Sequence, residues 1–290
     1  ERTMKQCFKL LTLAVGLLAG ITMTSCLGGD SEYQNSGSAI AKVYSNYGMY
    51  YYFMTPGRTL TITPTEASVN SLESKNENFK MSNLVGKIVN IGYIWNPDDP
   101  NVVQDDKGIQ GVDLVAIQSL DFPTLVVSEG STGTERDSVA THPIISLSPT
   151  DAYGQQYQPY FYDDNKSDII VPVKYFAPND SRATSASLTL VYYPDDEATI
   201  FDKNNGTLRL YLNYRVLGVE EYSTQNTYSN FVAFNLRDMN SNILGRWGSS
   251  MPEKVKIVAR VNAYSTDIDN SETKEEVYDV LTIEELESQQ

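Results

Sequence analysis

Cys26 is the residue of this chain with the most clearly defined chemistry. It closes the run Met23-Thr24-Ser25-Cys26 behind the apolar segment 10–23. Small residues directly before a cysteine suit lipoprotein signal peptidase, after which the thiol becomes a thioether that carries diacylglycerol. Several acyl chains hold a protein on a membrane far more firmly than one chain does. We therefore expect Cys26 to be lipidated and the chain to be anchored to a membrane through that lipid.

The apolar segment itself is interpreted as a cleaved signal. Lys5 and Lys9 form a short positive region before it, and a membrane-spanning helix would need about 20 apolar residues, more than this segment offers. We expect translation to start at Met4, residues 1–25 to be removed as a lipoprotein signal peptide, and residues 26–38 to form a flexible polar tether. Leu27 after the cysteine is compatible with sorting to the outer membrane of a Gram-negative bacterium, with periplasmic or surface-exposed display.

The cysteine and histidine inventory limits the remaining chemistry. Cys7 leaves with the signal and Cys26 is lipidated, so disulfides, cysteine nucleophiles and thiolate metal sites are excluded. His142 is the sole histidine; it could act as a general base near neutral pH, but Pro143 follows it and we expect a surface or strand-edge residue. One histidine cannot build a His-rich zinc site. No cofactor is expected.

One polar loop could hold a hard cation. Asp163, Asn165, Ser167 and Asp168 place oxygen ligands at the spacing of a calcium loop. The stretch lacks the glycine and the distal glutamate of an EF-hand, and the same residue types build hairpin turns. Calcium binding and a simple turn therefore stay as two interpretations of this loop.

Tyrosines gather in two segments and form the candidate binding surface. Exposed aromatic rings can stack on sugars, and tyrosine is favoured at protein interfaces. The alternative is that both groups are core and pleat residues of a β protein that has 20 tyrosines. The residues proposed for binding are Tyr47, Tyr50, Tyr51 and Tyr52 in the first segment and Tyr157, Tyr160 and Tyr162 in the second.

Composition predicts a β protein that avoids nucleic acid. Tyrosine outnumbers phenylalanine by 20 to nine, which suits half-exposed strands. The net charge of −15 at pH 7 repels nucleic acid, because that binding depends on basic residues that displace counterions.

Residues 39–121 are predicted to form a small OB-like β-barrel domain. Strand patterns cover 39–45, 49–55 and 59–63, a short helix fits 65–80, and strand patterns resume at 85–95 and 112–120. Five strands with an insertion between the third and the fourth are typical of an OB barrel.

Residues 122–290 are predicted to form an immunoglobulin-like β-sandwich domain, so that the whole chain is all-β. The clearest strand is 207–217, in which apolar and polar residues alternate, and Asn205-Gly206 before it predicts a tight hairpin. Many short strands without α/β alternation favour a sandwich. The strand patterns cover 125–128, 144–148, 168–176, 187–193, 207–217, 230–236, 254–264 and 276–283.

The order of these segments resembles the NigD-like lipoproteins of the Bacteroidetes. The shared features are the lipoprotein signal, the acidic polar tether, the small barrel that opens with Ala39-Ile40-Ala41-Lys42-Val43, and the larger β-sandwich. The resemblance implies a bacteriocin-associated or immunity role in the cell envelope. It carries no catalytic residues over to this chain, and Cys26 is the position that transfers with a defined chemistry.

Three functions are consistent with these features. The first is a non-enzymatic envelope lipoprotein that presents a binding surface to a protein partner, and the second is a surface glycan-binding lipoprotein. The third is a carboxylate-dependent hydrolase that would use acids such as Asp195-Asp196-Glu197. A glycosidase needs two acids that face each other across a substrate, whereas these adjacent acids follow Pro194 in an expected turn. No catalytic residues are therefore assigned.

Overall fold

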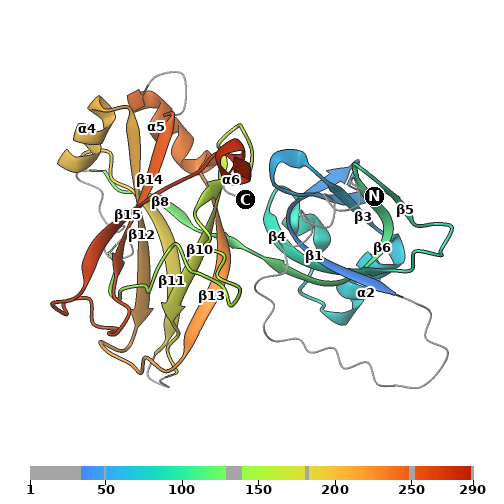
Figure 1. Cartoon of the computed structure of the whole chain (residues 1–290), viewed down its shortest axis with the longest axis horizontal. Helices are drawn as coiled ribbons and strands as arrows, with labels where there is room; N and C mark the ends of the chain where they lie inside the picture. The colour runs from blue at the N-terminus through green and yellow to red at the C-terminus, as the bar shows by residue number, and fades with distance from the viewer. Residues whose placement is uncertain (1–33, 49, 129–138, 180–182, 248–251, 289–290) are drawn as a thin grey trace. The chain divides into compact units, whose positions relative to one another are not determined.

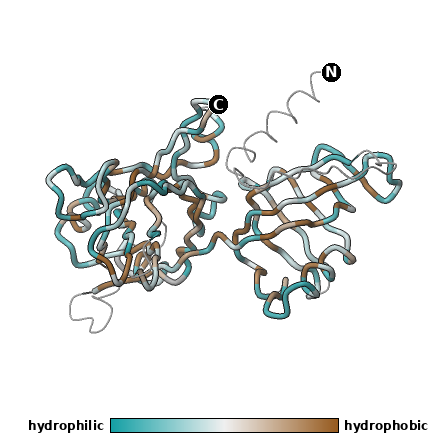
Figure 2. Tube along the Cα trace, turned by 90° about the horizontal axis from the view of Figure 1, so that it is seen from below, coloured by the Kyte–Doolittle hydropathy of each residue, from teal (hydrophilic) through white to brown (hydrophobic). Residues whose placement is uncertain are grey.

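The chain folds into two compact units, and the boundary between them falls between Asp121 and Phe122 in the sequence. The computed structural model describes residues 34–48, 50–128, 139–179, 183–247 and 252–288, so Cys26, the predicted signal and most of the predicted tether lie outside the described residues. Hydrophobic residues follow the strands of each unit, hydrophilic residues gather in the connecting loops (Figure 2), and each unit has its own core. Within the described ranges, no helix is both long and apolar enough to cross a membrane.

The first unit is a closed barrel of five strands (Figure 1). The strands are β1 (Asn35–Asn46), β2 (Tyr50–Met54), β3 (Thr61–Pro64), β4 (Ile88–Trp95) and β6 (Gly108–Ser119). They follow the order β3-β2-β1-β4-β6, and a parallel pairing of β3 with β6 closes the ring. The short β5 (Val103–Asp105) pairs with β6, and α2 (Glu66–Lys75) connects β3 to β4 through the 3-10 turn η3 (Met81–Leu84). This topology is that of an OB barrel, which confirms the predicted barrel.

A glycine makes the closure of the barrel sterically possible. Gly108 is paired with Thr61 and has a φ of +150°, and a Cβ at this position would lie 1.8 Å from the Thr61 carbonyl oxygen. The Thr61 N–H also donates to the Lys107 carbonyl oxygen at 2.8 Å. The two strands approach each other so closely here that only glycine fits.

The first strand begins earlier than predicted. The sequence predicts a tether up to residue 38, but Asn35–Ser38 belong to β1 and pair with β4, where Asn35 lies opposite Trp95 and Ser38 opposite Gly92. Gly37 lies against the ring of Tyr93, because a Cβ on Gly37 would come within 2.6 Å of the ring carbon Cζ. The polar, glycine-containing sequence is therefore held by main-chain pairing and by the aromatic ring that covers it.

The helix α2 and the η3 turn complete the barrel core. The Thr65 hydroxyl caps the helix by accepting the Ser68 N–H at 3.2 Å, and capping of this kind stabilises a helix by about 1 kcal/mol. Val69 of the helix and Met81 of η3 are buried in the same core as Phe53. The predicted short helix is confirmed, within narrower bounds.

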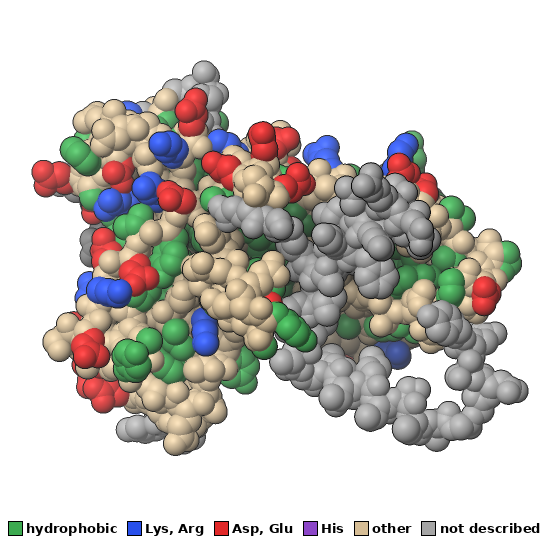
Figure 3. Space-filling model, in the orientation of Figure 1, with side chains coloured by type: hydrophobic (Ala, Val, Ile, Leu, Met, Phe, Trp, Pro, Cys, Tyr) green, Lys and Arg blue, Asp and Glu red, His purple; other side chains and the backbone are tan. Residues whose placement is uncertain are grey.

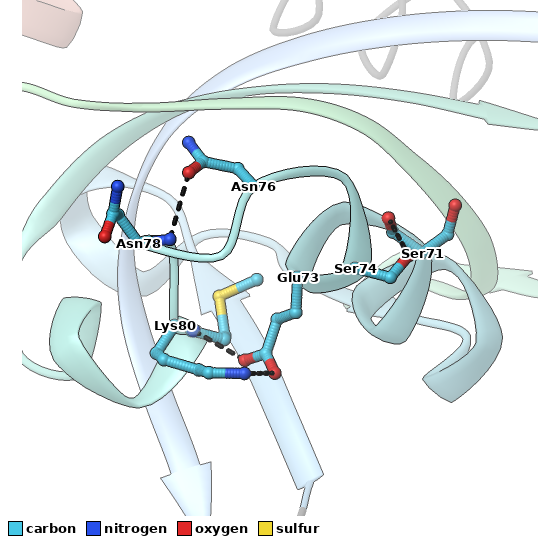
Figure 4. Close-up of polar contacts among 7 residues, drawn as sticks. Ser71, Glu73, Ser74, Asn76, Asn78 and Lys80 are labelled. Carbon is cyan, nitrogen blue, oxygen red and sulfur yellow. Dashed lines mark hydrogen bonds and ion pairs between the residues drawn. The ribbon is translucent and has the colours of Figure 1, made fainter.

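Glu73 fastens this helix to the turn that follows it (Figure 4). Its Oε1 accepts the Met81 main-chain N–H at 2.8 Å, and its Oε2 accepts Lys80 Nζ at 3.3 Å. The Met81 N–H lowers the pKa of Glu73; partial burial opposes this shift and Lys80 adds to it. The carboxylate thus holds Met81 in place in the barrel core.

The second unit contains two sheets. The smaller sheet has the order β7 (Asp121–Phe122), β13 (Thr227–Asn235), β10 (Asp168–Phe176) and β9 (Tyr160–Phe161). The larger sheet has the order β15 (Lys274–Asp279), β14 (Lys254–Val261), β12 (Thr207–Leu217), β11 (Ser185–Tyr192) and β8 (Thr124–Val126). One hydrophobic core includes Val171 and Phe234 from the smaller sheet and Leu210 and Ile257 from the larger sheet. The two sheets therefore pack face to face as a sandwich, and the all-β fold class is confirmed.

Two strand pairings in the larger sheet are parallel, namely β11 with β8 and β12 with β14. The sheets of immunoglobulin domains are antiparallel, so this sandwich differs from them in connectivity. Parallel neighbours need long crossover connections. The helix α5 (Arg237–Trp247) lies in one of the connections of the unit, and α6 (Ile283–Ser288) follows the last strand.

Two local predictions for the second unit were wrong. Asn205-Gly206 does not form a hairpin between two strands, because α4 (Glu197–Asn204) lies between β11 and β12 and Gly206, at a φ of +73°, ends that helix. Segment 144–148 is not a strand; it makes isolated bridges, with Ile144 opposite Val261 and Ser146 opposite Lys174.

Replacing Glu73 with Gln is expected to destabilise the barrel by about 1–2 kcal/mol, because the Met81 N–H loses a charged acceptor. The pKa of Glu73 is lowered from its ordinary value of 4.5, so this stabilisation is complete above pH 4.5 and is lost as the pH falls through the pKa of the folded state. Urea denaturation of a Trp247→Phe background, in which Trp95 alone reports on the barrel, measures the change. Glu77→Gln, at an exposed neighbouring position, is the control. Equal denaturation midpoints for both variants would show that the Glu73 contact is unimportant.

Candidate functional site

The hairpin of β1 and β2 carries a row of tyrosines on its outer side. Tyr44 lies opposite Tyr52, and Asn46 lies opposite Tyr50. Side chains alternate between the two faces of a strand, and Val43 and Phe53 are fully buried in the barrel core. Tyr44, Tyr50 and Tyr52 must therefore point away from the core.

The tyrosines of this hairpin differ in their contacts. The rings of Tyr44 and Tyr52 stack on each other with centroids 5.4 Å apart and planes inclined by 16°. Tyr50 is 62% exposed and Tyr47, in the turn, is 97% exposed. Tyr51 points the other way and packs against the barrel core. We call Tyr44, Tyr47, Tyr50 and Tyr52 the tyrosine face, and leave Tyr51 out because it is partly buried on the opposite side of the strand.

The backbone conformation at position 47 does not favour a tyrosine. Tyr47 has a φ of +55° and Gly48 a φ of +71°. A left-handed conformation is comfortable for glycine and tolerated by asparagine, whereas it is unfavourable for a bulky residue. A nearly fully exposed tyrosine at such a position contributes no packing to the turn.

The segment of sequence that carries the tyrosine face has few charged residues. Residues 33–65 contain no Asp or Glu, and their charged residues are Lys42 and Arg58, in a chain with 37 acidic residues. In OB barrels the face of the second and third strands and the adjoining loops bind oligosaccharides and oligonucleotides. The tyrosine face occupies β2, the second strand, and the loop before it. It therefore lies where OB barrels hold ligands.

The second group of predicted binding tyrosines belongs to the core. Tyr157, Tyr160 and Tyr162 are 8%, 6% and 0% exposed. The Tyr157 ring meets Phe231 edge to face at 5.5 Å, and its hydroxyl donates to Asp151 Oδ2 at 3.1 Å. Burial, together with the Asp151 carboxylate, raises the pKa of Tyr157 to about 12. These three residues cannot form a binding surface, and that prediction was wrong.

His142 is also buried, so the predicted surface position is wrong, although the residue does lie beside a strand, in an isolated bridge with Tyr214. Its side chain is 1% exposed, its Nδ1 lies 2.9 Å from Thr141 Oγ1, and its Nε2 has no hydrogen-bond partner among the described residues. The ring packs 5.1 Å from the ring of Tyr222 and 6.4 Å from that of Tyr214. Burial lowers the pKa of His142, while the Glu220 main chain and the Asp267 carboxylate oppose this shift. A buried neutral imidazole is a packing residue rather than a base that a substrate could reach.

The predicted calcium loop closes the turn between β9 and β10. Asp163 and Asp168 are 7% and 2% exposed. Asp163 Oδ1 accepts the Asn165 N–H at 3.2 Å, and Asp168 accepts Asn235 Nδ2 at 2.8 Å and the Ser167 hydroxyl at 2.9 Å. In the part of the chain that the structure describes, no group of three or more His, Cys, Asp or Glu side chains could hold a metal ion. The contacts of this loop are those of a hydrogen-bonded turn.

The acids Asp195-Asp196-Glu197 lead into a helix rather than a simple turn. Asp196 is the N-cap of α4, and its Oδ1 accepts the Ala198 N–H at 2.7 Å. Glu197 is in the first helical turn, where negative charge is favourable. Both residues therefore have structural roles.

The comparison with known proteins shows a shared fold. No protein-family model matches the chain, and no curated protein has a matching sequence. The crystal structure of a protein described as a lipoprotein from Bacteroides fragilis is 22% identical, with a TM-score of 0.63 over 85% of this chain and 97% of that one. A NigD-like immunity protein from Bacteroides caccae is 12% identical, with a TM-score of 0.47 over 85% of this chain and 94% of that one. The Bacteroides fragilis protein therefore shares the fold of this chain.

Folding stability is expected to depend on His142 below pH 6.5. Because the pKa of the folded state is lowered from 6.5, the unfolded chain takes up a proton first as the pH falls, and stability decreases between pH 6.5 and that lower pKa. Each unit of difference corresponds to about 1.4 kcal/mol. Urea denaturation of a Trp95→Phe background, in which Trp247 reports on the second unit, should show this loss between pH 7.5 and 5.5. His142→Phe should reduce this pH-dependent loss of stability. Tyr153→Phe is the control and should leave it unchanged.

The sole histidine also permits a direct measurement. Its imidazole proton resonances are the only ones of their kind in the chain, so their NMR titration gives the pKa without assignment. A midpoint at or above 6.5 would contradict the buried neutral state.

Proposed function

We propose that this chain is a non-enzymatic lipoprotein of the outer membrane that presents the tyrosine face of its barrel to a protein partner. The observation that carries the proposal is Tyr47, which is 97% exposed in a left-handed turn conformation. The lipoprotein assignment is supported by the run that ends at Cys26 and by the fold shared with the Bacteroides fragilis protein.

A protein partner suits the composition of the hairpin. The turn region reads Tyr44-Ser45-Asn46-Tyr47-Gly48, which are the residue types that dominate antibody binding loops. Tyrosine offers a large contact area and loses little conformational entropy when it is immobilised. The net charge of −15 argues against a nucleic-acid partner. The resemblance of the domain order to NigD-like lipoproteins points to a bacteriocin-type toxin or a neighbouring envelope protein.

A glycan ligand is the second candidate. Its support is the exposed aromatic surface on the side of the barrel where OB proteins bind oligosaccharides. The rings of Tyr50 and Tyr47 are more than half exposed, and flat exposed rings can stack on the apolar faces of sugars. The absence of acidic residues in 33–65 suits a neutral sugar as well as a neutral protein surface.

A photo-crosslinking amino acid at position 47 should capture a discrete protein partner in intact cells. The same probe at Tyr153, which is 94% exposed and lies in the second unit, is the matched control and should capture none. The double variant Tyr47→Ala/Tyr50→Ala should bind the captured partner at least about tenfold more weakly, as expected for central interface tyrosines. Glycan-array binding that this double variant abolishes would favour the glycan instead. Identical crosslinks at positions 47 and 153 would contradict the proposal.

Cys26→Ser should abolish lipid attachment and move the protein from the membrane fraction to the soluble fraction. Metabolic labelling with an alkyne fatty acid measures the lipid directly, and Cys7→Ser, which lies within the predicted signal, is the control that should keep the label. Persistent labelling of Cys26→Ser would contradict lipidation at this residue. Protease treatment of intact cells then distinguishes surface display from periplasmic display.

A further inference from the structure

The last strand of the larger sheet leaves one of its edges open. β15 is terminal in the order β15-β14-β12-β11-β8 (Figure 1), and no other strand of the described residues pairs with it. An open strand edge presents unpaired main-chain N–H and C=O groups, which an extended segment of another chain can engage.

The register identifies the main-chain groups at this edge. Val280 N donates to the Val255 carbonyl oxygen at 2.9 Å, and the antiparallel pairing continues with Ile257 opposite Tyr278 and Ala259 opposite Glu276. Residues that exchange hydrogen bonds alternate with residues that do not in an antiparallel pair. Positions 274, 276, 278 and 280 therefore face β14. The N–H and C=O groups of 275, 277 and 279 point away from it.

The side chains of the same three positions share the outer face of the strand. Tyr278 packs against the sandwich core, so its neighbours in alternation, Glu275, Val277 and Asp279, point the other way. All three are exposed, Val277 by 47%. The open edge thus combines outward main-chain groups with the pattern acidic, apolar, acidic.

The pairing strand β14 shows which side chains suit this pattern. Its residues opposite Asp279, Val277 and Glu275 are Lys256, Val258 and Arg260. Lys256 Nζ lies 3.5 Å from Asp279 Oδ1. Opposite charges on directly paired residues stabilise a sheet, so a second strand with the same basic, apolar, basic pattern matches the open side of β15.

A second copy of this chain is a poor match for the edge. Two β15 strands that pair antiparallel around Val277 would place Glu275 opposite Asp279, and like charges directly opposite each other destabilise a sheet. The face of the second unit in Figure 3 carries acidic and basic side chains in a mixed arrangement. An extended segment that pairs with β15 would therefore be selected by the side chains directly opposite its own, and not by a broad charged patch.

We propose that the open edge of β15 is a docking site for an extended segment of another protein, with a basic, apolar, basic pattern at alternate positions. This site is separate from the tyrosine face and does not depend on it. The bound segment would add a sixth strand to the larger sheet.

The test uses the mature chain with Cys26→Ser and the peptide Thr-Lys-Thr-Val-Thr-Arg-Thr-amide, which carries fluorescein on its N-terminal amine, and follows binding by fluorescence anisotropy. We expect saturable binding with a dissociation constant below about 1 mM and none for the peptide with Glu in place of Lys and Arg. The double variant Glu275→Gln/Asp279→Asn should abolish this preference, and it places no like charges opposite Lys256 and Arg260. If neither peptide binds the unsubstituted chain, Glu275 and Asp279 only prevent other strands from pairing with the edge. That result would overturn the proposal.

Main-chain pairing is tested by removing single N–H groups. Val277→Pro deletes an outward N–H and leaves the N–H groups of 276 and 278 on β14 intact, so it should weaken binding at least tenfold while the thermal midpoint stays near that of Val277→Ala. Two N-methylated peptides test the same point with an unchanged protein. One peptide is methylated at the main-chain nitrogen of the central Val and the other at that of the neighbouring Thr. The affinities of these two peptides for the protein should differ at least tenfold, because only alternate N–H groups of the peptide face β15. Equal effects would show charge adsorption without strand addition, which overturns the proposal.

Discussion

The parallel pairing of β3 with β6 is the contact on which the architecture of the first unit depends. These strands are far apart in the sequence, and their approach leaves no room for a side chain at Gly108, where a Cβ would lie 1.8 Å from Thr61 O. Closure of the ring gives every strand one enclosed face and one open face. Phe53 and Val43 are thereby committed to the interior, and Tyr44 and Tyr52, which alternate with them, are committed to the exterior. The tyrosine face is a consequence of barrel closure.

The tyrosines of the barrel hairpin and the buried tyrosines of the sandwich show that one residue type can have two different roles. In the barrel the tyrosines lie on a regular hairpin and are exposed at its outer side and turn. In the sandwich Tyr214 and Tyr222 are buried, and both hydroxyls donate to the Phe176 carbonyl oxygen, at 2.9 and 2.8 Å. Burial raises the pKa of Tyr222 to about 12, so the hydroxyl keeps its proton. A buried tyrosine thus needs an acceptor, whereas an exposed one is free to meet a ligand.

The two surfaces proposed for binding differ in the interactions they offer. The tyrosine face lies in a segment without acids and presents aromatic area. The edge of β15 presents main-chain hydrogen bonds framed by Glu275 and Asp279. Aromatic contacts provide affinity for a ligand whether or not it is charged. Strand addition instead favours ligands whose side chains have the right register and the right sign of charge. Two surfaces on two separate units could therefore hold two ligands of different chemistry.

Much of the fold could be predicted from periodicity. The bounds of β10 at Asp168–Phe176 and of β12 at Thr207–Leu217 agree with the prediction to the residue, because each is a sustained apolar or alternating run. α4 was not predicted, since its eight residues are too few to establish a helical period, and the Asn205-Gly206 pair that ends it is also typical of hairpins. The apolar residues in segment 144–148 favour a strand, although the segment makes only isolated bridges.

The sequence by itself determined the all-β class, the five strands of the barrel and the insertion between the third and the fourth, the inventory of reactive side chains and the lipoprotein-type run at Cys26, because these depend on composition and on patterns between near neighbours. Only the tertiary structure decided which tyrosines are exposed, that His142 is buried against Tyr222, and that β15 ends a sheet. Exposure and edge position depend on which distant strand packs against a residue. The irregular segment around Tyr157, Tyr160 and Tyr162 carries no period that reveals the strands that bury it.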